Sequence, residues 1–181
     1  RDTCKASADK FLKEANKVYN FQKSAIVQIT MFGGSASTED LVMKINKLNA
    51  ANDAVSNGTQ ILLASIKLES ERDEEGARKA LKKFPNVAAQ LNNLKQMNLT
   101  DTETEQVNVA LKEMNTFKSS FETMINAWVE VNAINQNAST ISNEVLTLVK
   151  DSSTEGIKNT TEIASNTTGI VSTAANTIII G

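Results

Sequence analysis

The chain has 181 residues, with 19 basic and 21 acidic side chains and a net charge of −2. That balance leaves no basic surplus for a nucleic-acid partner, and the lack of histidine removes the commonest general base and metal ligand. One proline and seven glycines favour long helices, and no segment alternates as a half-buried strand does. We therefore expect an all-α protein that is not an enzyme and needs no cofactor or metal.

The first helix is predicted over residues 3–32, and the pair Gly33-Gly34 is expected to break it. Its apolar residues recur in steps of three and four, the spacing of a helix that packs along others. Cys4, the single cysteine, is interpreted as an incidental residue near a frayed end. Gln22 fills one slot of a row that otherwise contains Phe11, Ala15, Val18, Ala25, Ile29 and Phe32.

The second helix is predicted over residues 38–70, because Ser37 and Asp40 form a capping-box-like start signal. The row expected to face the core is Leu41, Ile45, Leu48, Asn52, Val55, Thr59, Leu62 and Ile66.

The third helix is predicted over residues 74–97, with Pro85 inside it. Proline removes one backbone hydrogen bond, so a kink or a restart is expected there. Its expected core row is Ala77, Ala80, Phe84, Val87, Leu91 and Leu94.

The last helix is predicted over residues 100–181, starting at a capping box between Thr100 and Glu103. It would be about 120 Å long at the usual helical rise. Two successive steps of three, Trp128 to Val131 to Ile134, form a stammer that could mark the junction between two bundle layers. After Leu148 the row thins to small and hydroxyl residues, and the run Ile178–Ile180 predicts that a membrane span follows. The main row is Ala110, Met114, Phe117, Phe121, Met124, Trp128 and Val131.

Four helices with short connections predict one elongated antiparallel bundle over residues 1–181. The last helix is more than twice as long as any other. Either it overhangs the bundle, or two stacked four-helix modules share it.

Two groups of residues are candidates for binding a small ligand. Tyr19, Asn20 and Lys23 lie within one turn of the first helix, where Lys23 could neutralise an anion or simply be a surface lysine. Trp128 and Asn132 could line a pocket, or Trp128 could be a core aromatic and Asn132 could fix the helix register.

Three stretches carry a resemblance to a known family: Val18–Ala25 closed by Phe32-Gly33-Gly34, Asp40–Leu48 on the returning helix, and Phe117–Met124 after a capped corner. With them, the chain resembles the periplasmic sensor domain of methyl-accepting chemotaxis proteins, most closely the helical bimodular subtype.

The resemblance implies a homodimeric receptor in the bacterial inner membrane. Its periplasmic part would bind a small molecule, directly or through a periplasmic binding protein, and its cytoplasmic part would signal to a histidine kinase. Family members that bind carboxylates tend to use arginines on the first helix. This chain has Tyr19, Asn20 and Lys23 in that region, which favours a less charged ligand or indirect sensing.

Two other functions remain open from the sequence. One is the sensor domain of a membrane histidine kinase. The other is a secreted structural or interaction bundle, which glycosylation at the five N-x-S/T sequons would favour. Those sequons begin at Asn57, Asn98, Asn137, Asn159 and Asn166.

Overall fold

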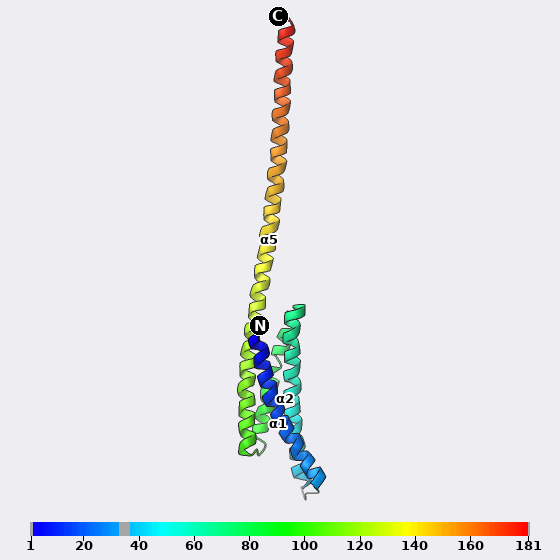
Figure 1. Cartoon of the computed structure of the whole chain (residues 1–181), viewed down its shortest axis with the longest axis vertical. Helices are drawn as coiled ribbons and strands as arrows, with labels where there is room; N and C mark the ends of the chain where they lie inside the picture. Colours follow the sequence, from blue (N-terminus) through cyan, green and yellow to red (C-terminus); the bar gives the residue numbers. More distant parts are fainter. Residues whose placement is uncertain (1, 33–36, 181) are drawn as a thin grey trace. The chain divides into compact units, whose positions relative to one another are not determined.

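The structure, a computed structural model, describes residues 2–32 and 37–180, and their regular structure is entirely helical (Figure 1). This confirms the all-α class. The expected break at Gly33-Gly34 lies outside the described residues. The helices are α1 (Asp2–Phe32), α2 (Thr38–Glu71), α3 (Glu74–Leu81), α4 (Phe84–Lys95) and α5 (Asp101–Ile180).

The chain divides into two units, one ending at Val129 and the other beginning at Glu130. We call them the bundle unit and the C-terminal unit. The division falls close to Val131, the middle residue of the predicted stammer, and α5 contributes residues to both units.

The bundle unit is an antiparallel four-helix bundle in which α3 and α4, one after the other, take the place of a single helix (Figure 1). In α1 the buried residues recur in steps of four and three from Cys4 to Gln22. The same spacing holds from Ala77 to Leu94, and from Glu103 to Phe121 on α5. Steps that average 3.5 residues are those of a left-handed bundle with side chains interlocked across the helices. The predicted core row of the third helix is therefore confirmed. That of the first helix is confirmed from Phe11 to Gln22, whereas Ala25 and Ile29 are only half-buried. That of the last helix is confirmed from Ala110 to Phe121, after which Ile125 is buried in place of Met124.

The row predicted for the second helix is wrong by one residue. The buried positions are Lys47, Ala50, Ala51, Ala54, Gly58, Ile61, Ser65 and Leu68. Asn52, Thr59 and Ile66 of the predicted row are exposed. The reason is steric: α2 packs against α1, α3 and α4, so the side with the smallest side chains faces the centre. Larger residues such as Leu62 lie half-buried at its flanks.

The predicted third helix is two helices separated by Lys82 and Lys83, and it ends at Lys95 rather than at residue 97. Pro85 occupies the first turn of α4, where its missing N–H costs no helical hydrogen bond. The expected restart is therefore confirmed. The Lys83 amide donates to the Ala80 carbonyl at 2.9 Å, so the break is one tight turn and the buried row passes through it.

Four phenylalanines from three helices fill the middle of the bundle. Phe117 of α5 has its ring centroid 5.2 Å from that of Phe84 and 6.3 Å from that of Phe11. Phe121 lies 6.2 Å from Phe84. All four side chains are buried, so they supply a large part of the apolar area removed from water.

Cys4 belongs to this core and is not an incidental residue near a frayed end. Only 3% of it is exposed, because α1 is already helical from Asp2 and the first of its buried positions falls at residue 4. Burial, followed by the negative charge of Glu69, raises the pKa of the Cys4 thiol to about 11. Cys4 therefore acts as a small apolar core residue.

The C-terminal unit contains the rest of α5, a single helix from residue 130 to 180. Its described side chains are exposed, apart from the half-buried Asn132. The described residues thus form one four-helix bundle. A second stacked module would need further helices beside residues 130–180, and the described residues contain none. None of the described helices combines the length and apolarity needed to cross a bilayer.

Candidate functional site

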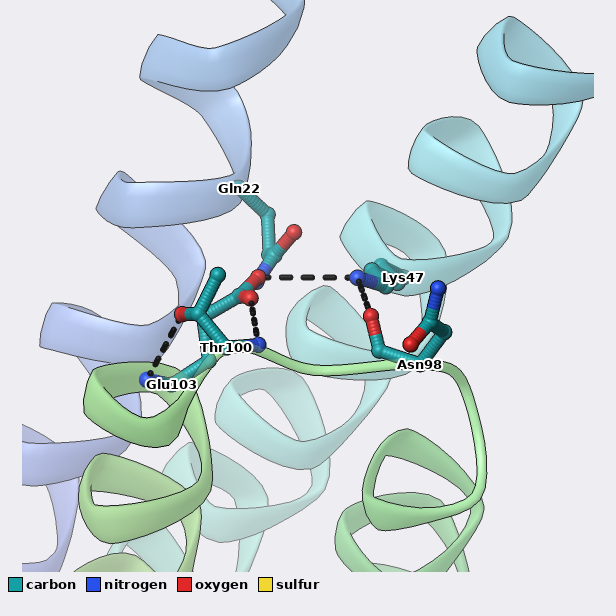
Figure 2. Close-up of polar contacts among 5 residues, drawn as sticks. All are labelled: Gln22, Lys47, Asn98, Thr100 and Glu103. Atoms are coloured by element: carbon teal, nitrogen blue, oxygen red, sulfur yellow. Dashed lines mark hydrogen bonds and ion pairs between the residues drawn. The ribbon is translucent and has the colours of Figure 1, made fainter.

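A buried polar layer joins three helices at the end of the bundle where α5 begins. We define it as Gln22 of α1, Lys47 of α2 and Glu103 of α5 (Figure 2). The Gln22 amide Nε2 donates to Glu103 Oε1 at 2.8 Å. The Lys47 ammonium lies 3.6 Å from the same oxygen. One carboxylate oxygen therefore receives a hydrogen bond from α1 and the charge of α2.

The turn between α4 and α5 completes the layer. The Thr100 amide donates to Glu103 Oε2 at 2.6 Å, and the Glu103 amide donates to Thr100 Oγ1 at 3.3 Å. This is the capping box predicted from the sequence. The Lys47 Nζ also donates to the Asn98 carbonyl at 2.9 Å. Asn98 has a positive φ of 27°, a backbone conformation that is uncommon for residues other than glycine. The Lys47 ammonium therefore holds the carbonyl of a residue in an uncommon conformation.

The environment of Glu103 favours its charged form. Burial by itself raises the pKa of this carboxyl. The hydrogen bonds from Gln22 and from Thr100 and the charge of Lys47 together outweigh burial, so the pKa lies below its ordinary value of 4.5. Glu103 is therefore ionised at neutral pH, and its charge is matched by a buried lysine.

A shallow groove with a volume of about 340 Å³ lies next to the polar layer. It begins at the first turn of α2, which is capped by Ser37 and Asp40 in the predicted capping box. Its walls are mainly apolar, with Glu39 as the one charged side chain. Asn46 and Met97 adjoin Lys47 and Asn98 of the polar layer. The lining residues are Thr38, Glu39, Val42, Met43, Asn46 and Met97.

The predicted ligand residues are not all brought together. Tyr19, Asn20 and Lys23 lie on α1 within one turn of Gln22. Tyr19 is half-buried, whereas Asn20 and Lys23 are exposed. Trp128 lies 25 residues beyond Glu103 along α5, about 38 Å at the usual helical rise. Because Glu103 bonds to Gln22, one small ligand cannot contact both Trp128 and the α1 group. Asn132 belongs to the C-terminal unit.

Trp128 closes the opposite end of the bundle. The Arg72 guanidinium lies 5.8 Å from the Trp128 ring centroid, within the range of a cation–π contact. Arg72 ends α2 with a φ of 59°, a left-handed conformation that is uncommon for residues other than glycine. This contact links the α2–α3 corner to α5, and no pattern in the sequence predicts it.

Sequence reasoning also missed Lys47 and the second role of Glu103. Lys47 lies outside the row assigned to the second helix, and Glu103 was interpreted only as a cap. Glu103 does stand four residues before Val107, in phase with the buried row of α5. That spacing is the signal by which its burial could have been predicted.

In the part of the chain that the structure describes, no three His, Cys, Asp or Glu side chains are grouped as metal ligands would be. No family model matches the chain, and no curated protein or solved structure was found to be similar to it.

Proposed function

We propose that this chain is the extracytoplasmic sensor domain of a transmembrane chemoreceptor, located in the periplasm as part of a bacterial inner-membrane protein. It would act as a homodimer and recognise a small molecule, directly or through a periplasmic binding protein. The sequence resemblance and the helical bundle support this proposal.

The observation that carries the proposal is that α5 belongs to both the bundle unit and the C-terminal unit. One helix supplies Glu103 of the polar layer and Phe117 of the aromatic core, and then continues to Ile180. A structural change in the bundle therefore acts on the same helix that forms the C-terminal unit. This is the arrangement that a receptor needs to pass a signal along its chain.

The polar layer sets the axial position of α5 against α1 and α2. An axial shift of one helical turn is about 5.4 Å, which would break the hydrogen bond from Gln22 and separate Glu103 from Lys47. The proposed signal is a change between two axial positions of α5. A ligand shifts that equilibrium only by binding one position more tightly than the other.

A ligand would affect the polar layer most directly by binding at Tyr19, Asn20 and Lys23, since these residues lie within one turn of Gln22 on α1. Lys23 would complement a negative group, and Tyr19 and Asn20 would offer polar and apolar contact. A ligand seated there and against a neighbouring helix would favour one position of α5.

A thermal screen tests binding. Amino acids, organic acids and amines are added to the purified chain, and unfolding is followed by circular dichroism. At 100 times its Kd, a ligand that binds only the folded state adds about 2.7 kcal/mol of stability. Asn20→Ala and Lys23→Ala should abolish the shift, whereas Lys13→Ala, an exposed α1 lysine, should not.

Signalling requires a second measurement. The chain is joined to the membrane spans and kinase-controlling half of a bacterial chemoreceptor, and kinase activity is measured with each compound from the screen. Spin labels at positions 13 and 115, exposed on α1 and α5, report axial movement. A bundle whose label distance and kinase activity stay constant at saturating ligand would instead be an interaction module.

A further inference from the structure

The C-terminal unit carries an uncharged stripe along one side of an exposed helix. From Ala138 to Ile178 the residues on this stripe follow each other in repeated steps of three, four and four. Its larger members include Ile141, Val145, Val149, Ile163 and Val171, and Gly156 lies near its middle. Val149 is 61% exposed and Ile163 is 67% exposed.

The charged residues of this segment identify the repeat. Steps of three, four and four give eleven residues in three turns, or about 98° per residue. With that rotation, every charge lies about 100° or more from the centre of the stripe. The six charged residues between 131 and 178 are Glu144, Lys150, Asp151, Glu155, Lys158 and Glu162.

A seven-residue repeat does not give this separation. Continued from Ile141, Val145 and Leu148, it would place Glu155 and Glu162 in the seam. Eleven residues in three turns is close to the natural period of an α-helix. The stripe therefore runs almost straight along the helix, with a slight right-handed twist, whereas the bundle unit uses the left-handed seven-residue spacing.

We propose that residues 138–178 pair along this stripe with the same residues of a second copy of the chain, parallel and in register. The parallel direction rests on the proposed function, in which both copies approach one membrane from the same side. In this arrangement Val149 meets Val149 of the second copy, and the helices come closest at Gly156.

Area and charge both support a second copy as the occupant. A stripe from Ala138 to Ile178 is about 60 Å long and 10 Å wide, so it offers about 600 Å² per copy, from the rise and diameter of a helix. Specific interfaces begin at about 600 Å² per partner. The positions that flank the stripe, such as Ser142, Ser153 and Ala164, carry no charge. Identical helices therefore do not repel each other there, and a partner of opposite charge is not selected.

Cysteine cross-linking tests the pairing on the full chain in a Cys4→Ser background. Val149→Cys, Gly156→Cys and Val171→Cys are oxidised separately with diamide, which accepts the two electrons and two protons released by each thiol pair. Parallel in-register pairing should give a disulfide-linked dimer with all three variants. Gly169→Cys is the control, because residue 169 lies on the opposite side of the helix and should give little dimer.

Charge substitution gives an independent measurement. In sedimentation at about 0.1 mM protein, Val149→Glu and Gly156→Glu should convert dimer to monomer, whereas Gly169→Glu should not. A monomeric parent chain, or a dimer cross-linked only at position 156, as an antiparallel pair would be, overturns the proposal. Either result leaves the ligand-induced thermal shift intact, so this proposal can fail while the sensing function stands.

Discussion

Gly58 of α2 faces the edge of the Phe11 ring of α1 so closely that a Cβ at position 58 would overlap Phe11 Cε1. Phe11 cannot easily yield, because it is fully buried and its ring is stacked on that of Phe117. The missing side chain at position 58 is therefore what allows α1 and α2 to approach each other here.

Gly58→Ala should destabilise the bundle although alanine is the better helix former. The propensity gain is about 1 kcal/mol, whereas overfilling a packed core costs about 1–3 kcal/mol. We expect a lower midpoint in urea unfolding followed by circular dichroism. Gly169→Ala is the control, since nothing lies within 4 Å of its added Cβ, and it should not lower the midpoint. An unchanged midpoint for Gly58→Ala would show that Phe11 can move aside.

Glu103 should make the stability of the bundle depend on pH in the acid range. Its pKa is lower in the folded state than its ordinary value of 4.5, so its contribution is present above that value. The contribution is lost as the pH falls through the lower, folded-state pKa. Glu103→Gln should therefore flatten the decline in unfolding free energy below about pH 5. Glu105→Gln, two residues further along α5 and exposed, should leave the wild-type profile unchanged.

The Lys47–Glu103 pair should be strongly coupled. In a double-mutant cycle of Lys47→Met and Glu103→Gln, we expect a coupling energy of about 1–3 kcal/mol, because both groups are buried and lie 3.6 Å apart. The cycle of Arg78→Met and Glu74→Gln is the comparison. That pair is 2.8 Å apart but partly exposed, so about 0.3–0.5 kcal/mol is expected. Equal coupling in both cycles would contradict a special role for the polar layer.

Cys4 should react slowly in the folded protein. Raising the thiol pKa from 9.0 to about 11 lowers the thiolate fraction at pH 8 about 100-fold, and burial further hinders access. Alkylation by iodoacetamide, followed by mass spectrometry, should therefore be at least about 100 times faster in 8 M urea. A Lys5→Cys, Cys4→Ser variant, with its thiol at an exposed position, should react rapidly even when folded.

The sequence predicts this fold well wherever large apolar side chains mark the core. Phe11, Phe84 and Phe117 were placed in the correct rows, because a buried phenylalanine dominates its helix face. The prediction is wrong on α2, where Ala54 and Gly58 are buried while Ile66 is 45% exposed. Which side of such a helix turns inward depends on the space that its neighbours leave.

The candidate site was harder to predict for a related reason. Lys47 and Glu103 have the appearance of surface residues, and only the packing of α1 and α2 against the start of α5 buries them together. Tyr19 and Trp128 belong to two separate candidate groups, and the sequence does not show how far apart those groups lie. The bond between Gln22 and Glu103 places Tyr19 near the start of α5, whereas Trp128 lies about 38 Å further along that helix.

Trp128 is the only tryptophan of the chain, and it lies beside the Arg72 guanidinium at the last turn of the bundle unit. Its emission will therefore come from a single place, where the α2–α3 corner meets α5. Without any introduced dye, the wavelength and quenching of that emission can follow movement at this junction in real time.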